Sequence, residues 1–126
     1  MSDSPEFTQD AFFDYIDEMR VRPLRLQVQY NSWFDFGNRV TKESFSESVS
    51  KIHQKLVDDR NVPPLKAYVI DDGWQDVQAD WSDKTWKVNQ KFSIDFSNSM
   101  MTVKQAKSNL GLWMSPGCLF GAQPAA

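Results

Sequence analysis

The sequence is poor in the residues that form disulfides and metal sites. It contains one cysteine, Cys118, and one histidine, His53. A lone cysteine cannot form an internal disulfide, and no cluster of thiols and imidazoles stands at metal-ligand spacing. We therefore expect no metal, and we interpret Cys118 as an inert small hydrophobe. His53 lies beside an apolar helical stripe, which favours a boundary residue over a catalytic base.

Positive charge and long apolar runs are also scarce. Lys and Arg number 14 against 17 Asp and Glu, for a net charge of −3, and no basic stripe compensates locally. This balance argues against a nucleic-acid partner. No run approaches the ~18 consecutive apolar residues that cross a bilayer, so no membrane partner is expected. The opening MSDSPEFTQD lacks the basic and apolar regions of a signal peptide. A secreted, periplasmic or cytoplasmic parent protein remains compatible with it.

Aromatic residues, by contrast, are abundant. They make up 13% of 126 residues and include five Trp and nine Phe. Disordered chains have few aromatics and a large net charge, which is the reverse of this composition. Because domains usually run to about 100–200 residues, we expect one folded domain at most.

Residue periodicity predicts that strands and helices alternate. Apolar residues recur at helical spacing or alternate at strand spacing in six segments. In chain order these are a helix over 8–20, a strand over 24–30, a helix over 41–59, a strand over 65–70, a helix over 100–108 and a strand over 110–114. Strands alternating with helices predict parallel pairing through right-handed crossovers. The fold class expected is therefore α/β with a parallel sheet.

The helix over 41–59 has the clearest amphipathic pattern, and Thr41 is its expected N-cap. Its stripe consists of Phe45, Val49, Ile52 and Leu56, which we expect to face the sheet. The segment 74–98 carries three Trp and two Phe with little periodicity. Because it is long for an ordinary connection and rich in aromatics, we expect it to be ordered and functional.

Polar and aromatic residues gather directly after the predicted strands. They are Asn31-Ser32-Trp33 after the first strand, Asp71-Asp72-Gly73-Trp74 after the second, and Trp113 with Ser115 at the third. In parallel α/β folds, ligands bind outside the carboxyl ends of the strands. An indole packs on the apolar face of a pyranose, and a carboxylate accepts hydrogen bonds from sugar hydroxyls. The pattern therefore predicts a sugar site.

Each of these residues also has a structural interpretation. Asp71 stands where a turn or helix cap would place an aspartate, and Trp33, Trp74 and Trp113 are equally typical of core aromatics. Asp35, in the loop after the first strand, is interpreted as a solvated residue.

Together the strand ends resemble the start of the catalytic barrel in α-galactosidase-like glycoside hydrolases, with glycoside hydrolase family 36 and its clan relatives the best match. The resemblance covers about 24–121. The elements that carry it are Gln29-Tyr30-Asn31-Ser32-Trp33, Val69-Ile70-Asp71-Asp72-Gly73-Trp74-Gln75, Trp86-Lys87-Val88-Asn89 with Lys91-Phe92, and Gly111-Leu112-Trp113. One departure is Ser115, where the family often has a glutamate.

The resemblance implies a (β/α)8 barrel of the TIM type, which needs roughly 250 residues. This chain would hold its first three β-strands and the helices between them. It would be a single partial domain over 1–126, with a leading helix over 1–23, three βα units over 24–121 and a tail over 122–126. Two open edges and an uncovered inner face would then favour self-association.

The activity implied is retaining hydrolysis of terminal α-galactosides or related α-linked sugars, with a carbohydrate as the partner. Asp71 and Asp72 would bind sugar hydroxyls and Trp33 would line the same subsite. Trp74 is expected as a second wall and Trp113 as its floor. The family's nucleophile and acid/base follow the fourth and sixth strands, so we expect no catalytic residue in this chain and no turnover from it alone.

Two other functions compete with this interpretation. A non-catalytic carbohydrate-binding or scaffold domain would use the same strand-end residues. A doubly wound nucleotide-binding domain is disfavoured, because bulky Asn31-Ser32-Trp33-Phe34 stands where a glycine-rich phosphate loop would be. We accordingly expect no cofactor.

Overall fold

The structure is a computed structural model that describes residues 5–23, 25–76 and 87–114. The expectations for Trp86, Ser115, Cys118 and the tail lie outside these residues.

Three short parallel strands form the sheet, as the alternation of strands and helices predicts. They are β1 (Gln29–Asn31), β2 (Ala67–Ile70) and β3 (Asn109–Leu112), in the spatial order β1-β2-β3. Tyr30 pairs with Tyr68, which pairs with Leu110, and both neighbouring pairs of strands are parallel. The fold is therefore α/β, and the sheet is compatible with part of a TIM barrel.

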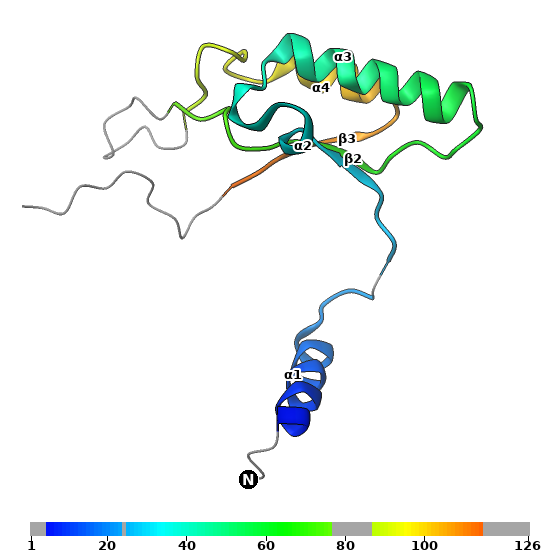
Figure 1. Cartoon of the computed structure of the whole chain (residues 1–126), viewed down its shortest axis with the longest axis vertical. Helices are drawn as coiled ribbons and strands as arrows, with labels where there is room; N and C mark the ends of the chain where they lie inside the picture. The colour runs from blue at the N-terminus through cyan, green and yellow to red at the C-terminus, as the bar shows by residue number, and fades with distance from the viewer. Residues whose placement is uncertain (1–4, 24, 77–86, 115–126) are drawn as a thin grey trace, which may run out of the picture.

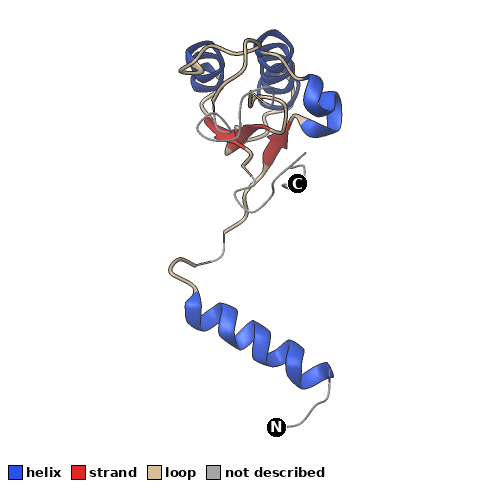
Figure 2. Ribbon diagram, turned by 90° about the vertical axis from the view of Figure 1, so that its left-hand side faces the viewer, coloured by secondary structure: helices blue, strands red, loops and turns tan. Residues whose placement is uncertain are grey.

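Two helices cover one face of this sheet (Figures 1 and 2). The first is α3 (Lys42–Ile52), which continues as a π-helical segment η2 (His53–Asp58), and the second is α4 (Ser97–Gln105). Thr41 caps α3 as predicted: its hydroxyl accepts the Ser44 N–H at 3.2 Å, and the Ser44 side chain accepts the Thr41 N–H in return.

The core lies between the helices and the sheet. Phe45 and Val49 are buried and Ile52 and Leu56 pack against them, which confirms the predicted apolar face of α3. The other buried hydrophobic residues of this cluster are Val40, Leu65, Tyr68, Ile70, Trp74, Phe92, Phe96, Val103 and Ala106.

Among the described residues, no helix lies over the opposite face of the sheet. Side chains alternate between the faces of a strand, so Asn31, Val69 and Gly111, which share one register row, face away from the helices. Cβ on Gly111 would lie 3.0 Å from Val69 Cγ2, which shows how closely these strands pack on the uncovered side. In the expected barrel this face would be the interior.

The strand predicted over 24–30 is too long. Only Gln29–Asn31 pairs in the ladder, and Leu26 is 88% exposed. The reason is the partner: Lys66 donates its N–H to the Val28 carbonyl at 2.9 Å, and β2 begins one residue later. Residues 25–28 alternate between apolar and polar side chains, but they lie ahead of the start of β2 and therefore do not form part of the β1–β2 ladder.

Other elements also differ from expectation. Strand β2 begins at Ala67 and not at 65, and β3 spans Asn109–Leu112 and not 110–114. The loop after β1 contains a short helix α2 (Trp33–Phe36) and a 3-10 turn η1 (Gly37–Arg39). Helix α4 begins at Ser97, ahead of the predicted start, because Asp95 Oδ1 accepts the Ser97 N–H at 3.0 Å.

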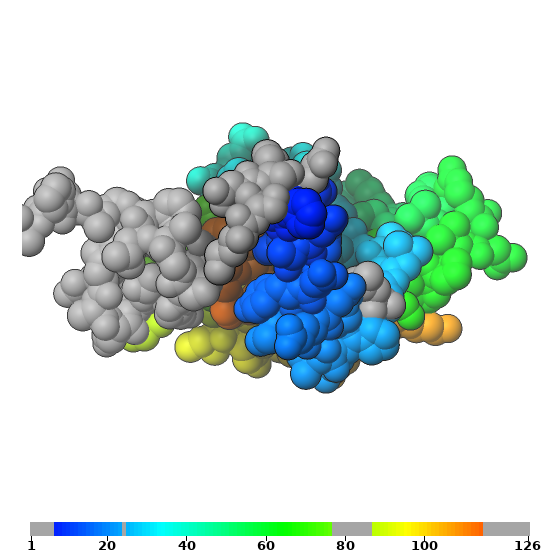
Figure 3. Space-filling model, turned by 90° about the horizontal axis from the view of Figure 1, so that it is seen from below, coloured from blue at the N-terminus to red at the C-terminus, as the bar shows by residue number. Residues whose placement is uncertain are grey.

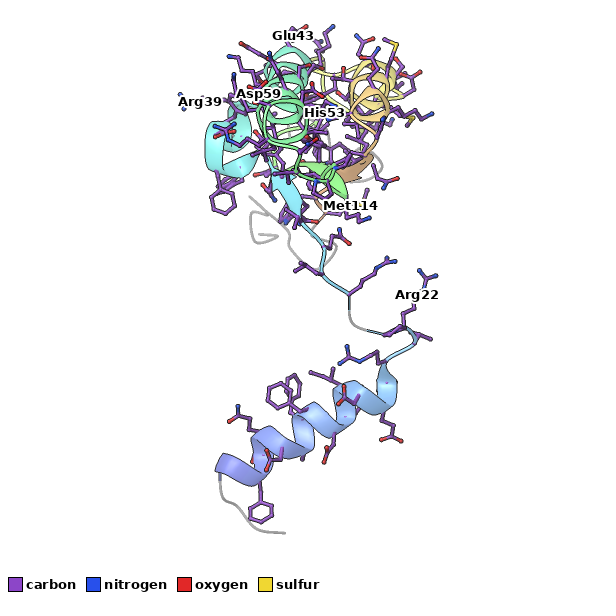
Figure 4. The ribbon with its side chains drawn as sticks, turned by 90° about the vertical axis from the view of Figure 1, so that its right-hand side faces the viewer. Arg22, Arg39, Glu43, His53, Asp59 and Met114 are labelled. Carbon is purple, nitrogen blue, oxygen red and sulfur yellow. The ribbon has the colours of Figure 1, made fainter. Side chains whose placement is uncertain are left out.

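The leading helix α1 (Pro5–Met19) forms as predicted but stands away from the sheet and its helices (Figures 1 and 2). In the view from below, α1 is the blue segment nearest the viewer (Figure 3). Figure 4 places Arg22 on the segment that joins it to the rest of the chain. Its aromatic side chains are exposed: Phe7, Phe12, Phe13 and Tyr15. The helix therefore takes no part in the core.

Candidate functional site

The candidate residues from the strand ends meet at one edge of the sheet, because the three strands run in parallel. Helix α3 runs back from this edge: Lys42 donates its N–H to the Lys91 carbonyl at 3.2 Å, so the helix begins there. His53 follows the last turn of α3 at the opposite end, half-buried with its Nε2 3.8 Å from Asp58 Oδ1 (Figure 4). His53 is thus a boundary residue remote from the candidate site, as its position beside the stripe predicts.

Asp71 is held from three sides and is 9% exposed. Its N–H donates to Ser32 Oγ at 3.0 Å, and its Oδ1 accepts the Asp72 N–H at 2.7 Å. Its Oδ2 accepts Asn31 Nδ2 at 2.6 Å. Asp71 therefore stabilises the turn through one oxygen and faces the end of β1 through the other.

Gly73 makes the turn after Asp72. Its φ is +112°, a region that L side chains rarely adopt, and a Cβ there would lie 2.5 Å from the Asn38 carbonyl oxygen. Lys91 Nζ donates to that same oxygen at 2.8 Å. The loops after β1 and β2 therefore touch backbone to backbone, and glycine is required for the contact.

Asn89, which follows in the chain, stabilises the turn through hydrogen bonds. Its Nδ2 donates to the Gly73 and Gln75 carbonyls at 2.7 and 3.1 Å, and its own N–H donates to the Trp74 carbonyl at 2.9 Å. Its Oδ1 accepts the Lys91 N–H at 2.9 Å. Residues 87–91, part of the segment expected to be functional, thus hold the loop that carries both aspartates.

Asp72 lies half-buried beside Lys91. Burial lowers the pKa of the Lys91 ammonium, and the charge of Asp72 opposes that shift. The site therefore contains two carboxylates and one cation that interacts with the second of them.

The three candidate tryptophans differ in exposure: one is exposed, one is buried and one is half-buried. Trp33 is 48% exposed at the start of α2, and its N–H donates to Asn31 Oδ1 at 2.8 Å. Trp74 is 2% exposed and stacks edge-on to Phe96, so it belongs to the core and not to an open wall. Its Nε1 donates to the carbonyl of half-buried Trp113 at 2.9 Å, which ties the second strand end to the third.

Asp35 is exposed, as expected for a solvated loop residue, and it also has a hydrogen-bond partner. Its Oδ2 accepts the Tyr30 hydroxyl at 2.6 Å. Burial, followed by this hydrogen bond, raises the pKa of Tyr30 to about 12. The pair lies on the helix-covered side of β1, since Tyr30 packs against Phe45 and Tyr68.

Sequence reasoning assigned neither Asn31 nor Asn89 a role of its own in this site. Both lie in stretches that carry the family resemblance, which was the available signal. Within the described residues no group of three or more His, Cys, Asp or Glu could hold a metal ion. In the same part of the chain, no helix has both the length and the apolar character needed to cross a membrane.

No protein-family model matches the chain, and no curated protein matches it in sequence. Among solved structures it is similar to TtGalA, the α-galactosidase from Thermus thermophilus, in a complex with p-nitrophenyl α-D-galactopyranoside. The two are 18% identical with a TM-score of 0.62, over 92% of this chain and 22% of that one. The chain thus spans less than a quarter of the length of the α-galactosidase. The likeness shows the fold alone: this chain folds like part of an α-galactosidase.

Proposed function

We propose that this chain is the first part, over 24–121, of the catalytic barrel of a retaining glycoside hydrolase of the family 36 type. It would act on terminal α-galactosides or related α-linked sugars. One observation supports this most directly: Asp71 is fixed at the carboxyl end of β2 by Asn31 and Ser32, beside the exposed Trp33. The α-galactosidase-like fold agrees with it.

In this proposal the two aspartates accept hydrogen bonds from sugar hydroxyls. A hydrogen bond to a charged group contributes roughly 1.5–3 kcal/mol. Trp33 offers an exposed indole for the apolar face of the sugar, and half-buried Trp113 is proposed as the floor of the subsite. Trp74 supports this arrangement from the core through its bond to the Trp113 carbonyl.

The two aspartates are not the catalytic pair. Retaining hydrolysis needs two carboxyl groups about 5–5.5 Å apart on either side of the glycosidic bond. Asp71 and Asp72 are adjacent in one turn, and the Asp71 carboxylate accepts the Asp72 N–H. They bind on one side only, so we expect no turnover from this chain.

The experiment is a titration of the 126-residue chain with methyl α-D-galactopyranoside, followed by two-dimensional NMR because a partial subsite binds weakly. We expect shifts at residues of the strand ends and a loss of affinity of about tenfold to a hundredfold in Asp72→Asn, from the energies above. Glu47→Gln is the matched control, because Glu47 is exposed on α3 and pairs with Lys51. Absence of shifts at the strand ends, or an equal loss in Glu47→Gln, contradicts the proposal.

A second candidate function is a non-catalytic carbohydrate-binding domain. The three described strands carry the proposed sugar-binding groups, and the expected nucleophile and acid/base would follow a fourth and a sixth strand. An aryl α-galactoside assay of the protein translated from the complete reading frame separates the two. Turnover supports the hydrolase, and sugar binding without turnover supports the binding domain.

A further inference from the structure

Asn31 contacts two of the proposed sugar-binding residues through opposite ends of one amide. Its Nδ2 donates to Asp71 Oδ2 at 2.6 Å, and its Oδ1 accepts the Trp33 N–H at 2.8 Å. A carboxylate only accepts hydrogen bonds and a backbone N–H only donates them. One orientation of the amide satisfies both neighbours, and the flipped one satisfies neither.

The contact joins segments that are distant in sequence. Asn31 and Asp71 are 40 residues apart, at the ends of adjacent strands. The next residue, Ser32, is fully buried and accepts the Asp71 N–H. Two consecutive residues of β1 and its following turn therefore hold both the main chain and the side chain of Asp71.

We propose that Asn31 is a positioning residue that sets the Asp71 carboxylate and Trp33 in one arrangement for sugar binding. This inference rests on the proposed function, since it assigns Asn31 a role in the same site. With Oδ1 bound to the turn and Oδ2 to Asn31, the carboxylate cannot rotate, and its remaining lone pairs point in fixed directions. An ordered acceptor loses less entropy when a hydroxyl binds it.

Other ionisable groups surround this contact. Asp72 lies on the same turn, and Lys91 interacts with it from the segment that follows. Asp35 on α2 bonds to the Tyr30 hydroxyl on the helix-covered side. None of these replaces the Asn31 donor at Asp71 Oδ2 in the described structure.

The decisive variant is Asn31→Asp, which keeps the size of the side chain and an acceptor for the Trp33 N–H. It replaces the donor at Asp71 with a second carboxylate oxygen. Two ionised carboxylates in contact repel each other. The contact becomes favourable only when one of them is protonated and the two share that proton. We expect affinity for methyl α-D-galactopyranoside to fall about tenfold or more at pH 7 and to recover as the pH falls toward about 5, because a shared proton restores the contact.

Asn109→Asp is the matched control. Asn109 Nδ2 donates to the Lys66 carbonyl at 2.9 Å at the other end of the sheet, so the chemical change is the same. Its affinity and pH profile should match those of the unaltered protein. The pair Asn31→Asp with Asp71→Asn restores a donor and an acceptor in exchanged places, and should recover stability if the single variant folds poorly.

A readout without sugar keeps the two proposals separate. Carboxyl 13C NMR of Asn31→Asp should show a group that titrates well above the ordinary value of about 3.9 for aspartate. If no such group appears, or if sugar affinity at pH 7 equals that of the unaltered protein, the positioning role is wrong. A loss of affinity without recovery at low pH also overturns it. Failure of the unaltered protein to bind sugar overturns the proposed function instead.

Discussion

At the scale of single residues, close backbone contact at Gly73 decides the geometry of the candidate site. We expect Gly73→Ala to lower the free energy of unfolding by about 2 kcal/mol or more, because positive φ costs an alanine roughly 1–2 kcal/mol and its Cβ would also meet the Asn38 backbone. Urea denaturation measures this loss. Gly37→Ala is the reference for backbone strain without a contact: φ is +53° there, and nothing lies within 4 Å of the added Cβ. A loss in Gly73→Ala no larger than the roughly 1–2 kcal/mol of positive φ alone would show that the Asn38 contact does not matter.

A second residue-scale prediction concerns the titration of Tyr30. Its pKa of about 12 should fall in Asp35→Asn, because the hydroxyl loses its carboxylate acceptor, but should stay above 10 because burial is the larger cause. Tyrosinate absorbance, corrected with Tyr30→Phe, measures the shift, and Asp14→Asn on α1 is the control. Since the folded-state pKa is raised, this stabilisation is complete below pH 10 and is lost as pH rises through about 12. An unchanged pKa in Asp35→Asn would contradict the hydrogen bond.

At the scale of elements, α3 depends on its cap as well as its apolar face. The strands are only three or four residues long and form few ladder hydrogen bonds. The fold therefore depends on the apolar side chains that α3 and α4 bury against the sheet. Thr41→Ala should lower the free energy of unfolding by about 1 kcal/mol, because the Ser44 N–H loses its acceptor. Ser50→Ala is the control, since its hydroxyl only bonds back to Ser46 on an exposed part of α3 and should change stability by less than about 0.5 kcal/mol. Chemical denaturation compares the two, and equal values would mean that the cap is not used.

At the scale of the whole molecule, the uncovered sheet face and its two edges should cause self-association. Within the part of the chain that the structure describes, β1 and β3 are each paired on one side only, and Asn31, Val69 and Gly111 face away from the helices. Unpaired edges are templates for pairing with another chain. Sedimentation velocity at micromolar concentration should show concentration-dependent association. A monomer with a cooperative melt above about 65 °C would contradict it.

Deletion of 1–19 locates that association. The exposed aromatic residues of α1 are an alternative contact surface. If the sheet is responsible, the shortened chain should associate as strongly as the full chain. Loss of association on deletion would assign it to α1.

The sequence by itself determined the alternation of the main strands and helices and the place of the candidate site. Helical and strand periodicity are local, so the amphipathic face of α3, its cap at Thr41 and the three parallel strands could be predicted. Parallel pairing then places every strand end at one edge, which brings Asp71, Trp33 and Trp113 together without further information.

Only the tertiary structure decided which of these residues is exposed and how each is held. Trp33 and Trp74 both follow a strand end, yet Trp74 is buried and packs against Phe96, whereas Trp33 is exposed. The length of β1 depended on where β2 begins. The bond from Asn31 to Asp71 spans 40 residues. Burial and hydrogen-bond partners of this kind come from non-local contacts, which local periodicity does not contain.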